Sequence, residues 1–295
     1  MSGRANVLFD APGPRARLRN NALTLVAAIV LIGLAYFVYA RFDERGQWRW
    51  EIWQPFVEAD TWVNFIIPGL IGTLKAAALG AVFALLFGAV FGLARLSDHR
   101  WIRVPAGVVV EVFRAIPLLL LIFFVFYLAP SLFGGGDYTL MAVVIGLTLY
   151  NGSVLAEVVR AGVLSVPRGQ SEAAYAIGLR KTGVMTLVLL PQAITAMMPA
   201  IVSQLVVLLK DTALGYIIAY VDLLNMGFKI IPANHFGSLV PAAIVIGIIY
   251  IGLNALLSAL ATWLERRSRR SRKTSARPVA PPTAIPSAAG PSLPD

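Results

Sequence analysis

Residues 172–191 read EAAYAIGLRKTGVMTLVLLP, a stretch with polar residues that separates two long apolar runs of the chain. A connection that only turns the chain between neighbouring helices needs about 2–8 residues. This one uses roughly twenty, and its pattern predicts a short helix, a break at Gly178 and a second helix. Loops held by a rigid scaffold often carry function, so we interpret this stretch as a docking surface at the membrane.

The composition places the chain among membrane proteins. Hydrophobic residues make up 58% of the sequence and charged residues only 14%, which is typical of a polytopic membrane protein. The absence of cysteine excludes disulfides and cysteine-based metal sites. The net charge is +10, but the Lys and Arg residues flank apolar segments, so nucleic acid is not a predicted partner.

The apolar segments predict the fold class, an all-α polytopic transmembrane helix bundle in a lipid bilayer. A helix needs about 20 apolar residues to cross the hydrocarbon core. The predicted spans are 22–40, 66–94, 112–130, 139–162, 187–209 and 239–263. The second of these is longer than a bilayer requires, so we expect it to be tilted.

The distribution of positive charge predicts the orientation. Four regions that alternate to one face carry 18 Lys and Arg residues, whereas the opposite face carries five. Cytoplasmic loops of membrane proteins are enriched in these residues. We therefore expect both termini and the 172–191 stretch to be cytoplasmic, in a multi-pass membrane protein.

Several segments lie outside the predicted transmembrane core. The expected organisation is a basic cytoplasmic N-terminus (1–21), an additional transmembrane helix (22–40), an aromatic interfacial segment at the outer face (41–62), the core (63–263) and a disordered basic and Pro-rich cytoplasmic tail (264–295). An alternative interpretation of residues 22–40 is a signal peptide. Its apolar run of about 18 residues exceeds the 7–15 of such peptides and favours an uncleaved anchor. The aromatic segment has the alternative of a contact surface for an external partner.

The residue types of the 172–191 stretch have physical roles. Glu172 near a helix start would favour the positive end of the helix dipole, and Ala173 and Ala174 would keep one face flat for a close-approaching partner. Gly178 permits a left-handed helix end. Pro191, after Leu190, is expected where a new helix begins, because its missing N–H costs little there.

The same stretch resembles the loop by which permease subunits of bacterial ABC importers dock onto their ATPase. That pattern is E-A-A, three residues, G, nine residues, I-x-L-P, and here every fixed position matches except that Val188 replaces Ile. Three further stretches resemble the polar amino acid permease family, which covers histidine, glutamate, glutamine, arginine and opines. They are FRAIPLL (113–119), NGSVLAEVVRAG (151–162) running into VPRGQSE (166–172), and LKDTAL (209–214).

This resemblance covers roughly residues 63–263, with the coupling loop at 166–191, and it implies a MetI-like ABC importer permease fold. Ile116 stands where Thr is common in the family, and Ala213 stands where Ser is common. The implied partners are an ABC ATPase dimer, a second permease subunit, identical or homologous, an extracytoplasmic substrate-binding protein and an amino acid substrate. The chain lacks the G-x-x-x-x-G-K-[ST] phosphate loop, so it is not expected to be an enzyme, and ATP hydrolysis falls to the partner ATPase.

Polar residues at membrane depth are candidates for a substrate path or gate, because charges inside a membrane are costly. The candidates are Lys75, Asn151, Glu157, Arg160, Gln204, Asp211 and Thr212. Glu157 and Arg160 are three residues apart on one helical face, so they are expected to pair, either as a brace for the docking loop or as a gate. Lys75, placed near the outer end of its span, either snorkels to the interface or favours an anionic substrate.

The expected substrate follows from these candidate path residues and from the family resemblance. Few unpaired carboxylates are available for a cationic side chain, so glutamate is the first choice, with glutamine or a basic amino acid as alternatives. An ion-coupled secondary transporter is a further alternative, although it needs intramembrane carboxylates near the midplane.

Small residues recur every four positions in the second span, from Gly72 to Gly92. Such a stripe lets two helix backbones approach closely, so Gly80, Gly88 and Gly92 are predicted packing positions, with a sliding subunit interface as the alternative. The two histidines, His99 and His235, are expected on opposite faces of the membrane. We therefore predict no metal site and no cofactor.

Overall fold

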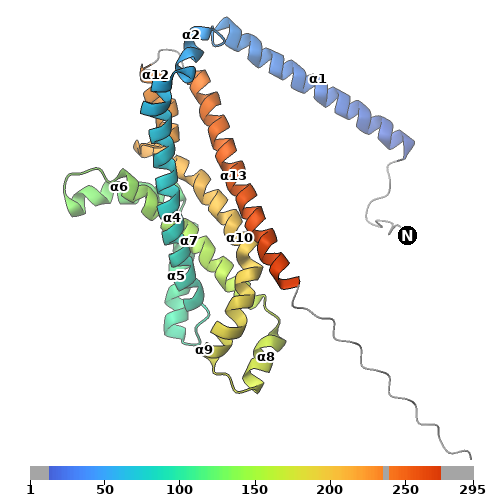
Figure 1. Cartoon of the computed structure of the whole chain (residues 1–295), viewed down its shortest axis with the longest axis vertical. Helices are drawn as coiled ribbons and strands as arrows, with labels where there is room; N and C mark the ends of the chain where they lie inside the picture. The colour runs from blue at the N-terminus through green and yellow to red at the C-terminus, as the bar shows by residue number, and fades with distance from the viewer. Residues whose placement is uncertain (1–12, 235–238, 274–295) are drawn as a thin grey trace, which may run out of the picture. The chain divides into compact units, whose positions relative to one another are not determined.

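The computed structural model describes residues 13–234 and 239–273, and it contains helical elements and no strand in these ranges. Figure 1 shows the long helices and the short turns that join them. The α-helices are α1 (Pro14–Glu44), α2 (Trp50–Trp53), α3 (Ala59–Thr61), α4 (Ile67–Ala94), α5 (Arg100–Ala115), α6 (Leu118–Phe133), α7 (Thr139–Leu164), α8 (Arg168–Ala176), α9 (Lys181–Gly183), α10 (Leu190–Asp211), α11 (Leu223–Asn225), α12 (Ile231–Asn234) and α13 (Leu239–Lys273). The 3-10 helices are η1 (Gln54–Val57) and η4 (Thr212–Ile218), and the π-helices are η2 (Trp62–Ile66), η3 (Val184–Leu189) and η5 (Met226–Ile230).

Two compact units share these elements. One unit contains residues up to Gly72 together with Val221–Ile249, and the other contains Thr73–Tyr220 and the residues from Tyr250 onward. Helices α4 and α13 each contribute to both units. All sites discussed below, except the aromatic turn and Asp222, lie in the second unit.

Five helical segments of the described residues are long and apolar enough to cross a membrane, and a bent pair makes a sixth. The prediction of one continuous span at 112–130 is wrong, because the chain breaks there between α5 and α6, whose axes differ by 98°. Ile116 at the break is extended, with φ −83° and ψ 128°. The cause is Pro117, because a proline disfavours the helical conformation of the residue before it.

The ends of the chain also differ from expectation. α1 begins at Pro14 and ends at Glu44, so the first apolar helix is longer than the predicted 22–40, and it has no buried residue. α13 continues to Lys273, so residues 264–273 are helical and the prediction of disorder is wrong for that part of the tail. Residues 1–12 and 274–295 lie outside the described residues.

Three tryptophans fix the turn that follows α1. The indole N–H of Trp48 donates to the carbonyl of Tyr39 at 3.2 Å, that of Trp53 to Gln47 at 2.9 Å, and that of Trp62 to Phe56 at 2.7 Å. The Trp48 ring also stacks between Tyr39 and Trp53. These indole groups therefore brace the local backbone, in addition to the interfacial role that tryptophan often has in membrane proteins.

Each π-helical turn ends two residues before a proline. η2 precedes Pro68, η3 precedes Pro191 and η5 precedes Pro232. A proline inside an α-helix clashes with the carbonyl of the residue four positions earlier, and the wider π turn places that carbonyl elsewhere. The helices therefore continue past these prolines.

The core of the second unit forms around α7, which packs against α5, α6 and α10. Within this unit the small-residue stripe of α4 lies against α7. A Cβ at Gly80 would lie 3.2 Å from Leu147 Cβ, and one at Gly88 would lie 2.6 Å from Leu155 Cβ. At Gly92 it would lie 2.7 Å from Val159 Cβ. The two backbones approach so closely that these positions leave no room for a side chain, and the stripe contacts α7 of the same chain.

Candidate functional site

The coupling segment, residues 166–191, begins with the short helix α8. This helix ends in a Schellman motif, in which the Gly178 N–H donates to the Tyr175 carbonyl at 2.9 Å and the Leu179 N–H to the Ala174 carbonyl at 3.2 Å. Gly178 has φ +84°, the left-handed backbone that the sequence predicts there. Glycine adopts this conformation without the steric penalty of a Cβ.

The two alanines of the motif differ in exposure. Ala174 is only 3% exposed, on the side where α8 packs against η3, whereas Ala173 is exposed. The prediction that both alanines form a flat docking face is therefore wrong for Ala174, which lets α8 lie close to the next helix. Ile177, 79% exposed, and Tyr175, 50% exposed, form an apolar projection beyond it.

The structure corrects one further expectation for this segment and confirms another. Glu172 is exposed, but it is the fifth residue of α8 and the first turn holds no acidic residue, so it does not lie at the positive end of the helix. Pro191 lies in the first turn of α10, as the sequence predicts, although helical residues from Lys181 through η3 precede it without a break. Pro191 follows the η3 π turn, which accommodates its ring, and the neighbouring Leu190 is half-buried.

Polar contacts attach the coupling segment to the rest of the unit. Lys181 forms an ion pair with Asp98 in the α4–α5 loop. Its hydrogen bond lowers the pKa of Asp98 from the usual value of an aspartate. Gln192 Nε2 donates to Gln170 Oε1 at 3.4 Å, which joins α10 to α8. Leu190 and Lys181 line a cavity of about 330 Å³ beside this loop. These contacts join the coupling segment to the α4–α5 loop and to α10.

Glu157 is the centre of an ion-pair network just before the coupling segment. Arg160 binds it through Nε at 3.1 Å and Nη2 at 2.5 Å, as the sequence predicts from their spacing. Arg95, at the end of α4, donates from Nη1 to the other carboxylate oxygen at 2.8 Å. Arg95 also lies 3.5 Å from Glu111 of α5. The network therefore joins α4, α5 and α7, and both oxygens of Glu157 are occupied.

Asn151, Gln204 and Asp211 form a hydrogen-bonded row in the interior of the unit. The Asn151 side chain is fully buried; it donates from Nδ2 to Asp211 Oδ2 at 3.2 Å and accepts from Gln204 Nε2 at 2.6 Å. Neighbouring Thr212 is also buried, and its hydroxyl donates to the Leu209 carbonyl at 2.7 Å. The structure thus brings three of the predicted path residues into contact and turns Thr212 toward its own backbone.

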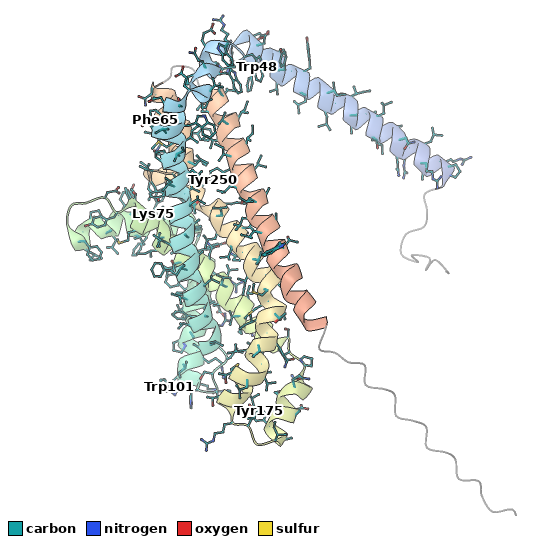
Figure 2. The ribbon with its side chains drawn as sticks, in the orientation of Figure 1. Trp48, Phe65, Lys75, Trp101, Tyr175 and Tyr250 are labelled. Atoms are coloured by element: carbon teal, nitrogen blue, oxygen red, sulfur yellow. The ribbon has the colours of Figure 1, made fainter. Side chains whose placement is uncertain are left out.

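Lys75, which Figure 2 labels, belongs to α4. The helix that contains it runs from Ala59 to Ala94, and its uninterrupted apolar run begins at Ala76, directly after Lys75. The place of Lys75 near the outer end of the span stays a prediction. Its side chain is exposed on the surface of the single chain. Membrane proteins usually direct an exposed cation beside an apolar run toward the headgroups, water or a protein partner.

Asp222 is a buried acid that the sequence reading did not select. It caps α11 by accepting from the Asn225 N–H at 2.7 Å, and it lies between two predicted spans. Burial raises the pKa of its carboxyl to about 6. Among residues 13–234 and 239–273, no group of three or more metal-ligating side chains lies close enough to hold a metal ion.

Comparison with known proteins gives the family. Residues 80–270 match the model of the binding-protein-dependent transport system inner membrane component. The chain belongs to this family. The permease is 42% identical over 222 residues to the glutamate transport system permease protein GluD of Corynebacterium glutamicum, across 75% of this chain and 81% of GluD. It is 34% identical over 204 residues to the probable glutamine ABC transporter permease protein GlnP of Bacillus subtilis, across 69% of this chain and 93% of GlnP.

A solved structure supports the same assignment. The crystal structure of an amino acid ABC transporter with histidines matches with a TM-score of 0.61 and 31% identity, across 68% of this chain and 93% of the other. The predicted fold class, an all-α ABC importer permease, is thereby confirmed, and the chain is an amino acid ABC importer permease of the membrane.

Proposed function

We propose that this permease forms the translocation path of a glutamate importer. The single observation that carries the substrate is the 42% identity to GluD, which spans three quarters of the chain. The exposed position of Lys75 supports the same choice, because a cation beside the path would attract an anionic side chain. Lys75 would face the path, and the half-buried Gln204 and Asp211 would offer amide and carboxylate groups to the polar ends of the amino acid. The buried Asn151 would hold these two side chains in place.

We further propose that the coupling segment docks onto a separate ATPase. Ile177 and Tyr175 offer an apolar projection that no element of the described chain covers, and Glu172 and Ala173 are exposed beside it. The Schellman motif at Gly178 holds this projection in one conformation. ATP-driven closure of an ATPase dimer would then shift the permease population through contacts that differ between its two states.

The Glu157 network acts in this proposal as a brace rather than as a gate. Arg95 and Arg160 already saturate the carboxylate, so it is not available to a substrate. Its position between α4 and α7, a few residues before the coupling segment, suits it to transmit movement of that segment to the helices.

The proposed assembly contains two permease subunits, an ATPase dimer and an extracytoplasmic binding protein, with both termini of this chain in the cytoplasm. The absence of native cysteine makes the orientation testable by single-cysteine labelling. A cysteine at Ser171 is expected to react with an impermeant maleimide only from the cytoplasm, and one at Gly135, which has open space around it, only from outside. Labelling from the opposite side at either position would contradict the orientation.

The substrate is tested by uptake. Cells that express this permease with its partner subunits should accumulate labelled glutamate, and excess unlabelled glutamate or aspartate should abolish the signal. Lys75→Gln, which removes the charge and keeps the length of the side chain, should reduce glutamate uptake more than glutamine uptake. Strong competition by arginine or histidine, without competition by acidic amino acids, would overturn the glutamate proposal. Uptake that persists without the ATPase would favour a secondary transporter instead.

A further inference from the structure

Three arginines line one cavity near the coupling end of the second unit. Arg95, Arg103 and Arg160 border a space of about 360 Å³ together with Val104, Gly107, Val108 and Glu111. Arg95 directly follows the last residue of α4, and Arg103 lies in the first turn of α5, so both lie where a spanning helix meets the headgroup region. The cavity is therefore a basic recess at the membrane surface and not part of the interior path.

The charges of this cavity do not balance. Glu157 accepts hydrogen bonds from Arg160 and from one nitrogen of Arg95. Glu111 lies 3.5 Å from another Arg95 nitrogen. Arg103 donates from Nη1 to the Ser97 carbonyl at 3.2 Å, and a guanidinium carries five N–H donors in all. Asp98 lies within electrostatic range of Arg103 but is already paired with Lys181. Glu111 is two helical turns beyond Arg103, about 12 Å along the axis, so it does not neutralise this end. An excess cation with donors to spare is suited to a phosphate oxygen.

An apolar stripe adjoins the basic recess. Trp101, Val104, Val108 and Val112 recur every three or four residues on one face of α5, and their side chains are 75%, 57%, 55% and 47% exposed. Val104 and Val108 belong to both the stripe and the cavity. Figure 2 shows Trp101 at the same end of the second unit as Tyr175 of the coupling segment. Exposed tryptophan at such a level is typical of the membrane–water interface.

We propose that this cavity binds the phosphate of an anionic glycerophospholipid in the leaflet on the coupling side. The phosphate would lie against Arg103, with Arg95 and Arg160 behind it, and the acyl chains would lie along the Trp101–Val112 stripe. A soluble phosphate would bind the arginines but leave the apolar stripe uncovered. A lipid would bind the arginines through its phosphate and cover the stripe with its acyl chains. Basic pockets between helices on the cytoplasmic side are known to bind anionic headgroups. Bound lipid would then contact the Arg95–Glu157–Arg160 network that precedes the coupling segment.

Native mass spectrometry of the full chain in neutral detergent tests the proposal with phosphatidylglycerol as the probe. We expect one retained phosphatidylglycerol per chain and no comparable retention of phosphatidylcholine. Arg103→Gln should weaken the retention about fivefold, the effect of one basic side chain near an anionic surface, and Arg103→Lys should keep most of it. Arg100→Gln is the matched control, because Arg100 is an exposed arginine of the same helix that does not line the cavity.

Two further measurements distinguish a bound lipid from other occupants of the cavity. Val108→Asn should weaken phosphatidylglycerol retention, and millimolar glycerol phosphate should compete poorly. If glycerol phosphate displaces the lipid fully and Val108→Asn has no effect, the site takes a soluble anion and the lipid assignment is wrong. Equal retention by wild type and Arg103→Gln, or loss of all retention when two copies of the permease assemble, would also overturn it.

Discussion

Gly178→Val is expected to reduce transport by about tenfold or more while leaving the protein inserted in the membrane. Gly178 has φ +84°, and a β-branched residue there is strained by about 1–2 kcal/mol whatever the surrounding space. A difference of that size shifts an equilibrium by roughly 5–30-fold. The helix end would relax to another conformation, which would move Ile177 and Leu179 away from their positions in the Schellman motif. Under the docking proposal, uptake and substrate-stimulated ATP hydrolysis should therefore both fall by about tenfold or more.

The coupling segment offers a matched control for this substitution. Gly169 lies in α8, has no neighbouring atom within 4 Å of an added Cβ and does not have a positive φ, so Gly169→Val should retain most of the uptake. Gly178→Asn should restore part of the activity, because asparagine tolerates the left-handed conformation better than other side chains. Membrane content of each variant is measured by immunoblot. Normal uptake by Gly178→Val at normal membrane content would contradict the role assigned to this turn.

Backbone features with a local cause were predictable from the sequence. The left-handed Gly178 follows from a glycine after a short helix and before a basic stretch, and the apolar runs gave five of the membrane-spanning segments. The span at 112–130 was not predicted correctly, because hydropathy averages over a window and ignores the effect of Pro117 on Ile116. The X–Pro pair within FRAIPLL was the signal that could have shown the break.

Partners that are distant in sequence were not predictable in the same way. The Glu157–Arg160 pair has a helical spacing of three residues, whereas Arg95 and Glu157 are 62 positions apart and meet only when α4 packs on α7. The position of Arg95 at the end of an apolar run was the available hint. The burial of Ala174 was not predictable either, because the packing of α8 against η3 decides which alanine is buried.

The close approach of α4 and α7 leads to the second large effect, on stability. At Gly88 an added Cβ would lie 2.6 Å from Leu155 Cβ and 3.2 Å from the Ala156 backbone nitrogen. The Ala156 contact is backbone, so rotation of a side chain cannot relieve it, and the two helices would have to separate. Insertion of extra volume into a packed core costs about 1–3 kcal/mol for a few methylenes, and leucine adds four carbons. Gly88→Leu should therefore lower the thermal unfolding midpoint and the yield of monodisperse protein.

Gly252→Leu provides the comparison that assigns this effect to packing. Gly252 is also a helical glycine of a predicted span, but an added Cβ there has no neighbour within 4 Å. Both substitutions remove a glycine from a helix and add the same hydrophobic side chain, so propensity and hydropathy change equally. Fluorescence-detected size-exclusion chromatography after heating should show a lower midpoint for Gly88→Leu and a midpoint near wild type for Gly252→Leu. Equal midpoints for the two variants would mean that the α4 stripe tolerates side chains, and that α4 and α7 are not held by the contacts at Gly88 and Gly92.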